Sequence, residues 1–321
     1  MLLGDVAGRQ VLFVGGKGGV GKTSVASGIA LARAREGARV LVVSTDPAHN
    51  LGHLWDRTIG DTIAQLAAPD GVVDGLEVDP ERTVERHLAA VRRTMDRLLP
   101  ERLHRQAARH LELARSAPGT HESAVLDRIA EVVEDLAGAY DLIVFDTAPT
   151  GSTVRLLALP DQLGAWTDAL LSNRDRADRF GAALRGLGGE DDRPPAKDEL
   201  RAVLEARRRR FVGLREQITD PTRTSFVIVL LAERMPIAES VELHRSLAAL
   251  GVDIGALVAN RRSPLDAGSL LAGQSLLEAE HLVSLRRQLP DVPLFELPLV
   301  PGLSSGEAGV SAIADTLASA I

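Results

Sequence analysis

The sequence has 321 residues, 45% hydrophobic and 25% charged, which is enough apolar mass for one large or two modest domains with a buried core. This composition excludes disordered, collagen-like and mini-protein classes. Acidic residues outnumber basic residues by 44 to 37, for a formal net charge of −7, so we expect no general attraction to nucleic acid or to anionic membranes.

Cysteine and lysine usage are both skewed. The sequence contains no cysteine, which excludes disulfides, thiolate zinc sites, cysteine-ligated iron–sulfur clusters and a cysteine nucleophile. Of the 37 basic residues only Lys17, Lys22 and Lys197 are lysine. Two of the three therefore fall in one short N-terminal segment, where a compact point charge serves better than a planar guanidinium.

The sequence lacks the patterns of a leader or a membrane span. The first ten residues, MLLGDVAGRQ, have no basic start followed by a continuous apolar stretch. The longest apolar runs, such as Phe226–Ala232, are much shorter than the ~20 residues of a spanning helix. We therefore expect a soluble cytoplasmic protein.

Five short runs rich in leucine and β-branched residues are typical of parallel strands buried on both faces. They are Val11–Val14, Val40–Val43, Leu142–Phe145, Phe226–Leu231 and Gly255–Ala259. Between them lie helical patterns that each stop at a glycine, Thr23–Glu36, His121–Ala137 and Ala238–Leu250. The alternation predicts an α/β fold, a mostly parallel sheet flanked by helices with sites at the carboxyl ends of its strands.

Two longer stretches, 82–115 and 161–217, are arginine-rich and helical in pattern. We interpret them as helical insertions that form a subdomain of a single domain spanning 1–321, without a core of their own. The second is interrupted by GLGGEDDRPPAKDE, Gly186–Glu199, whose glycines, prolines and charges predict a mobile loop.

A glycine-rich segment, GGKGGVGKTS, follows the first predicted strand directly and leads into a helix. Its glycines satisfy GxGxxG, and Asp46 stands near where a ribose-binding acid would lie, so a dinucleotide site is one interpretation. The same residues also satisfy the more demanding GxxxxGK[ST], which favours a phosphate loop. The residues expected to bind the nucleotide are Gly15, Gly16, Lys17, Gly18, Gly19, Val20, Gly21, Lys22, Thr23 and Ser24.

The physics of such a loop assigns roles to its side chains. Backbone N–H groups curl around the phosphates at the start of a helix, Lys22 neutralises β/γ oxygens and Thr23 ligates Mg²⁺. Lys17 is unusual because a phosphate loop needs no lysine at its second position. It is either a solvated loop charge or a group that reaches a phosphate, of its own site or a partner's, and acts on transition-state charge.

Three further polar residues follow predicted strands. Asp46, in STDPAHNL, is held extended before a proline, and we assign it to orienting or deprotonating the attacking water. Asp146 ends the strand in DLIVFDTAPTGST and is the expected Mg²⁺ partner, so the predicted metal site comprises Thr23, Asp46 and Asp146. Thr147–Thr153 then forms a polar loop suited to sensing the γ-phosphate. Asn260, in VANRRSP, carries an amide that can donate to and accept from adenine. Each of these residues can also be a turn former.

Together these segments resemble the ArsA/guided-entry (tail-anchored protein targeting) ATPase family, within the larger deviant phosphate-loop class of MinD, ParA and nitrogenase iron proteins. The resemblance is carried by GGKGGVGKTS, STDPAHNL, PGTHES, DTAPTGSTVRLLALP and QITDPTRTSFVIVLLAE leading to VANR. It implies a P-loop ATPase acting as a nucleotide-gated dimer with itself or a paralogue. In that dimer Lys17 contacts the partner's nucleotide, Asp46 activates water, Asp146 lies on the Mg²⁺ side and Asn260 contacts adenine.

The resemblance implies two outputs, driving a membrane pump partner or carrying hydrophobic protein segments. Arsenite-stimulated relatives use cysteine thiolates and eukaryotic targeting relatives use a CxxC zinc clamp, and neither can exist in this sequence. Ser152 stands where many members carry histidine. The alternative, a ParA/MinD-type positioning ATPase, is weakest because the terminal run EAGVSAIADTLASAI has no basic residue.

Overall fold

The computed structural model describes two compact units of the chain. The first comprises Met1–Pro80, Asp135–Leu157 and Gln217–Ile321, and the second comprises Glu81–Glu134 and Ala158–Glu216. The residues described are 4, 8–46, 50–98, 104–105, 108–109, 112–113, 115, 119–136, 138–148, 151, 153–159, 196–300 and 306–319.

The first unit is built on an eight-stranded sheet within the described residues, in the order β3-β4-β2-β5-β1-β6-β7-β8. Only β3 and β4 pair antiparallel; the other neighbours are parallel. The strands are β1 (Val11–Gly15), β2 (Arg39–Ser44), β3 (Ala64–Ala67), β4 (Val72–Glu77), β5 (Leu142–Asp146), β6 (Thr224–Leu231), β7 (Ile254–Arg262) and β8 (Leu294–Pro298). The predicted mostly parallel α/β fold is therefore confirmed.

The five predicted strands correspond to β1, β2, β5, β6 and β7, the continuous central part of the sheet. Their side chains are almost entirely buried on both faces, which is why they are written as unbroken apolar runs. The strands β3, β4 and β8, which lie at or next to the edges of the sheet, were not predicted, because AQLA, VVDGLE and LFELP interrupt their apolar residues with glutamine, glycine, proline or acids. The edge strands β3 and β8 have one neighbour fewer to bury them, so their pattern is weaker.

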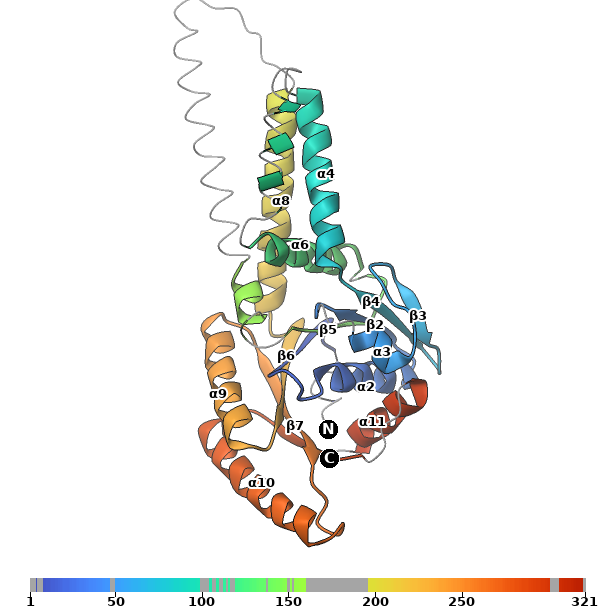
Figure 1. The fold of residues 1–321 in the computed structure, drawn as a ribbon, viewed down its shortest axis with the longest axis vertical. Helices are drawn as coiled ribbons and strands as arrows, with labels where there is room; N and C mark the ends of the chain where they lie inside the picture. The colour runs from blue at the N-terminus through green and yellow to red at the C-terminus, as the bar shows by residue number, and fades with distance from the viewer. Residues whose placement is uncertain are drawn as a thin grey trace, which may run out of the picture. The chain divides into compact units, whose positions relative to one another are not determined.

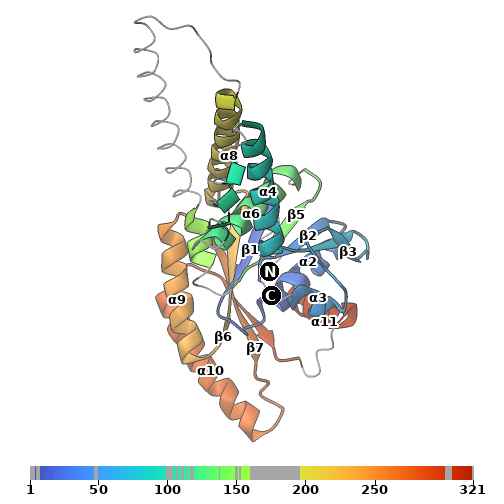
Figure 2. The same ribbon diagram turned by 45° about the horizontal axis from the view of Figure 1, so that its top comes forward.

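Helices cover both faces of this sheet (Figure 1). On one side lie α2 (Lys22–Arg35) and α11 (Glu307–Ser319), with the short α3 (Asn50–Trp55) nearby. On the other side lie α9 (Arg234–Ala249) and α10 (Ser269–Gln288), which also appear together when the view is turned (Figure 2). The core between α2 and the sheet is made of aliphatic residues such as Val14, Ile29 and Val42, all fully buried.

The register of the parallel strands brings several chain segments to one edge of the sheet. Val14 of β1 and Ser44 of β2 both lie opposite Asp146, and Ser44 also lies opposite Glu77 at the end of β4. Because the order reverses at β1, which pairs with β5 on one side and β6 on the other, this edge has the crevice that α/β sheets use for ligands.

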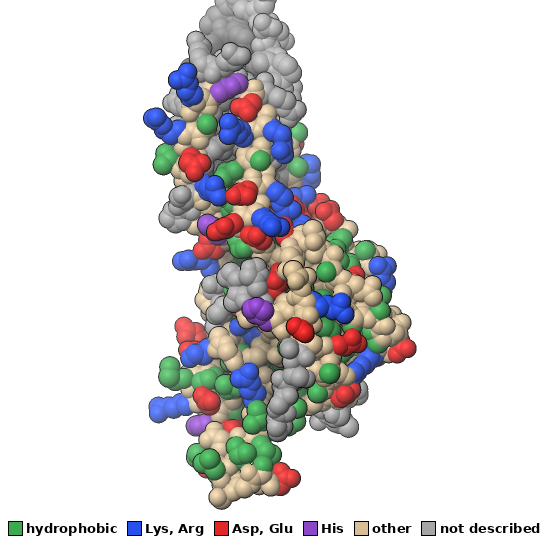
Figure 3. All heavy atoms as spheres, turned by 45° about the vertical axis from the view of Figure 1, so that its right-hand side comes forward, with side chains coloured by type: hydrophobic (Ala, Val, Ile, Leu, Met, Phe, Trp, Pro, Cys, Tyr) green, Lys and Arg blue, Asp and Glu red, His purple; other side chains and the backbone are tan. Residues whose placement is uncertain are grey.

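The second unit is helical in its described part. It contains α4 (Pro80–Leu98) from its second residue on and most of α6 (Thr120–Leu136) and α8 (Ala196–Thr219). On the face of its described part that Figure 3 shows, basic and acidic side chains are interspersed. Arg210 on α8, for example, pairs with Glu131 and Glu134 on α6.

Two predicted boundaries need correction. The predicted mobile loop Gly186–Glu199 extends too far, because Ala196–Glu199 are the first turn of α8. Lys197 and Glu199 favour helix and Asp198 suits a first helical turn, so their charge was given too much weight as a loop signal. Similarly, Thr153 is already helical although it was placed in a loop. Residues 161–195, with the rest of the predicted loop, lie outside the described residues, and no described helix is long and apolar enough to span a membrane.

Candidate phosphate-binding site

Three glycines of the loop adopt backbone conformations that side chains disfavour. Gly16, Gly19 and Gly21 have φ angles of 149°, 82° and 93°. A Cβ at Gly16 would lie 2.1 Å from the carbonyl oxygen of Val229, and one at Gly21 would lie 2.4 Å from Asn260 Nδ2. These glycines let the loop pass directly over β6 and beneath the end of β7.

Three carbonyl oxygens of the loop accept hydrogen bonds from side chains of the protein. Lys22 Nζ donates to the carbonyl of Lys17 (3.2 Å), Arg261 Nη1 to that of Gly19 (3.3 Å) and Asn260 Nδ2 to that of Val20 (2.8 Å). An anion-binding loop needs its carbonyls satisfied elsewhere so that its N–H groups can converge on the anion. The three contacts are therefore compatible with an anion-binding loop.

The end of β5 places a buried carboxylate against the start of α2. Thr23 Oγ1 donates to Asp146 Oδ2 at 2.6 Å, and Asp146 is fully buried. Burial raises the pKa of Asp146 to about 7, because the Thr23 hydrogen bond and the charge of Lys22 only partly offset the lost hydration. Burial likewise lowers the pKa of Lys22, against the opposing charges of Asp146 and Asp46.

This arrangement fits a hydrated divalent cation. The second oxygen of Asp146, Oδ1, is buried and has no hydrogen-bond partner among the described residues. A hydroxyl and a carboxylate are oxygen ligands of the kind Mg²⁺ takes, and Mg²⁺ uses few protein groups together with waters and phosphates. No group of three or more His, Asp or Glu side chains that could hold a metal ion is found in the described part of the chain.

Two other acids, Asp46 and Glu77, lie at this edge of the sheet, and only Asp46 was predicted. Asp46 follows β2, and its charge acts on both Lys22 and Asp146. Glu77, which was not predicted, ends β4, is 3% exposed and accepts a hydrogen bond from the N–H of Gly52 in α3 (3.0 Å). It therefore anchors the helix that follows the Asp46 segment. Glu77 could have been predicted as an acid at the end of a strand, but strand β4 was not predicted.

The predicted γ-phosphate sensor is described only in part. Thr147 Oγ1 donates to the carbonyl of Val14 (3.0 Å), next to the loop, and Thr153 Oγ1 donates to that of Ala148 (2.7 Å). Both threonines are buried. Pro149, Thr150 and Ser152 lie outside the described residues, as do Pro47–His49 after Asp46.

A cavity of about 190 Å³ lies beside the loop on the β7 and β8 side. It is lined by Ser24, Val25, Asn260, Arg261, Leu297, Pro298, Leu299, Val300, Ile313 and Thr316. Its apolar walls with an amide at one end suit a planar base. Asn260 uses one N–H on Val20 and accepts the N–H of Arg261 with Oδ1 (2.9 Å), so one N–H and one lone pair remain for a ligand.

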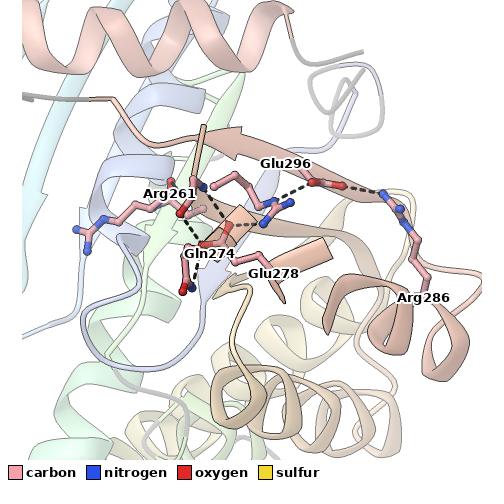
Figure 4. Close-up of polar contacts among 8 residues, drawn as sticks. Arg261, Gln274, Glu278, Arg286 and Glu296 are labelled. Atoms are coloured by element: carbon pink, nitrogen blue, oxygen red, sulfur yellow. Dashed lines mark hydrogen bonds and ion pairs between the residues drawn. The ribbon is translucent and has the colours of Figure 1, made fainter. Parts of the chain in front are cut away.

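A second buried carboxylate, Glu278 of α10, supports this end of β7 (Figure 4). It accepts hydrogen bonds from Ser263 N (3.0 Å), Ser263 Oγ (2.7 Å) and Gln274 Nε2 (3.3 Å), and it pairs with Arg262. Burial would raise the pKa of Glu278, but these bonds outweigh it and the pKa is lowered. Arg261 is thereby held at a φ of 57°, a conformation that a non-glycine residue keeps only when its surroundings impose it.

The structure therefore brings most of the predicted residues to one place. The loop, Asp146 and Asn260 share the carboxyl edge of the sheet, and Asp46 lies within electrostatic reach. Sequence reasoning missed Glu77, Glu278 and Glu239, the last of which pairs with Lys17 at 2.9 Å. The two helical acids gave no signal, because a glutamate on a helix is usually solvated.

Comparison with known proteins identifies a family and several relatives. Residues 9–319 match the family model described as anion-transporting ATPase. The arsenical pump-driving ATPase of Escherichia coli is 35% identical over 307 residues, 94% of this chain and 48% of that protein. That of Acidiphilium multivorum is 35% identical over 312 residues, 96% of this chain and 48% of that protein.

A relative of a different kind is the ATPase GET3B of Arabidopsis thaliana, 32% identical over 311 residues, 91% of this chain and 74% of that protein. The chain spans about half the length of the two bacterial relatives. Since the family model covers nearly all of the sequence, the chain belongs to the anion-transporting ATPase family.

Proposed function

We propose that this chain hydrolyses ATP to ADP and phosphate, with Mg²⁺ as cofactor, in a nucleotide-gated dimer. The observation that carries the proposal is Asp146, a buried carboxylate with one unpartnered oxygen, bonded to Thr23 and close to Lys22 at a loop shaped for phosphate. The relatives named as ATPases support the same activity.

The chain's own residues divide the work as follows. The loop N–H groups bind the β- and γ-phosphates, and Lys22 neutralises charge on their oxygens. Thr23 and Asp146 hold the cation, which when bound neutralises the charge that develops on the phosphates. Asp46, next to this group, orients or deprotonates the attacking water. Asn260 contacts the adenine in the cavity beside the loop.

Dimerisation gives Lys17 its role in this proposal. We assign it to the nucleotide of the partner, where its charge acts on the transition state as an arginine finger does. The partner is a second copy or a paralogue. The bacterial relatives, about twice the length of this chain, have room for two such units in one polypeptide.

The proposed output is to drive a membrane pump partner or to carry hydrophobic protein segments. The helical insertions 82–115 and 161–217 are proposed to form a subdomain. A thiolate site for arsenite is not part of the proposal, since the sequence has no cysteine. A positioning ATPase is disfavoured by α11, which carries no basic residue for a membrane surface.

Phosphate release from MgATP tests the proposed activity. Thr23→Ala should lower the rate at least about 10²-fold, because it removes a hydroxyl from the cation site. Thr222→Ala is the matched control: it removes the same group from an exposed turn preceding β6 and should behave as the unmodified protein. No phosphate release by the unmodified protein, or equal rates for both variants, would contradict the proposal.

The dimer and the output are tested with a trapped form. Asp46→Asn in ATP should have twice the monomer mass by light scattering and return to the monomer in ADP. When Asp46→Asn is purified with ATP from the cells that naturally make the protein, a membrane protein or a hydrophobic segment should copurify with it. Lys22→Ala, which should bind phosphate poorly, should not copurify with either. A monomer in both nucleotides, or equal recovery with both variants, would rule out the gated dimer as the working form.

A further inference from the structure

Lys17 has a partner within its own chain. Its Nζ lies 2.9 Å from Oε1 of Glu239, which is on the second turn of α9. The two side chains are 39% and 38% exposed, so the pair is half-buried. The partners are 222 positions apart in sequence, and nothing in the local pattern of either predicts the contact.

The sheet explains why these residues meet. Gly15 at the end of β1 lies opposite Ile228 of β6, and Gly16 passes close over the carbonyl of Val229. The chain leaves β6 at Leu231 and enters α9 at Arg234. The first turns of α9 therefore stand next to the phosphate loop.

The pair is held more firmly than an ordinary surface pair. The second carboxylate oxygen of Glu239, Oε2, is buried and has no hydrogen-bond partner in the described part of the chain. If Lys17 moved away, Glu239 would keep a sheltered oxygen without a partner and lose the cation that balances its charge. Leaving such a group unsatisfied opposes the separation.

A phosphate and Glu239 would compete for the ammonium group of Lys17. Lys17 has three N–H donors but one charge, and a carboxylate at 2.9 Å offsets the attraction that this charge has for a phosphate. We propose that Glu239 is a positioning residue that withholds Lys17 from phosphate and so lowers the rate at which bound ATP is hydrolysed. This inference rests on the proposed function.

The test is kcat/KM for MgATP in a double-mutant cycle. Glu239→Gln keeps the shape and removes the charge, and should raise kcat/KM about two- to five-fold, mainly through a higher kcat, because the freed charge of Lys17 acts on the transition state. Glu242→Gln makes the same change at an exposed position of α9 and should have no effect. In a Lys17→Ala background, Glu239→Gln should also have no effect, because its action passes through Lys17.

Two results overturn the inference: no rise in kcat/KM for Glu239→Gln, or an equal rise in the Lys17→Ala background, which would indicate general electrostatics. Glu239→Asp, which keeps the charge but shortens the reach, should show a smaller rise and provides a second variant if the glutamine form unfolds. Absence of hydrolysis by the unmodified protein contradicts the proposed function instead, so the two failures are distinguishable.

Discussion

The proposed site has a phosphate end, at the glycine-rich loop and Asp146, and a base end, at the cavity beside Asn260. A buried carboxylate lies at each end, but the two carboxylates differ. Glu278, at the base end, is surrounded by donors from Arg262, Ser263 and Gln274, and its pKa is lowered. Asp146, at the phosphate end, has one oxygen bonded to Thr23 and the other without a partner among the described residues, and its pKa is raised.

The difference indicates that Glu278 supports the fold, whereas Asp146 is suited to binding a ligand. A satisfied carboxylate has its charge balanced inside the protein, so it stabilises the fold and needs nothing more. A buried carboxylate with an open oxygen is held in an unfavourable state by the surrounding structure, and a cation can relieve it. Substitutions at the phosphate end should therefore change the rate of hydrolysis and the pH dependence of unfolding. Substitutions at the base end should change the free energy of unfolding and the affinity for ATP.

The largest expected effect is on chemistry at the phosphate end. Asp46→Asn keeps the shape but removes the base, and should lower phosphate release about 10²–10⁴-fold. ATP binding, measured by calorimetry, should remain, because the loop and Lys22 are unchanged. Retained hydrolysis would remove Asp46 from its assigned role.

The pH dependence of stability should be dominated by Asp146. Its pKa is about 7 when folded and 3.8 ordinarily, so it is protonated in both states only well below pH 3.8. As pH rises towards 7 the unfolded form ionises first, and the free energy of unfolding falls by up to about 4 kcal/mol. Urea unfolding without Mg²⁺ or nucleotide should show this loss, and Asp146→Asn should abolish it. Asp266→Asn, on an exposed loop, is the control and should leave the loss unchanged.

At the base end the expected effect is on folding. Glu278→Ala leaves Arg262 without one of its two partners and Ser263 without its acceptor, and should lower the free energy of unfolding by about 3 kcal/mol. Glu280→Ala, exposed on the same helix, should change it by less than about 0.5 kcal/mol. Equal effects in urea denaturation would mean that Glu278 is not a support.

The smallest effect is on affinity. Asn260→Ala should raise the KM for ATP about ten-fold with little change in kcat, because base binding is the same in the ground and transition states. Gln288→Ala, which removes an exposed amide at the far end of α10, is the control. A fall in kcat with an unchanged KM would instead indicate that Asn260 acts through the carbonyl of Val20 in the loop.

Whether a site residue could be predicted depends on whether the sequence next to it carries a recognisable pattern. The loop, Asp46 and Asp146 each follow a buried strand, and parallel strands bring their ends together, so local patterns sufficed. Glu239 and Glu278 are unmarked acids on helices, and only the packing of α9 and α10 gives them partners. Strands β3, β4 and β8 were missed because polar residues, glycine or proline interrupt their short apolar runs. Helices α10 and α11 were missed because glycine and small or exposed apolar residues weaken their amphipathic patterns.

The buried Trp55 gives the molecule an optical reporter. Its indole Nε1 donates to Ser27 Oγ at 3.0 Å, joining α3, which follows the Asp46 segment, to α2, which begins at Lys22. Trp55 is 2% exposed, and the sequence has only one other tryptophan, Trp166. With Trp166→Phe as the background, the emission of a single indole would follow any shift between these two helices in real time, without an added label.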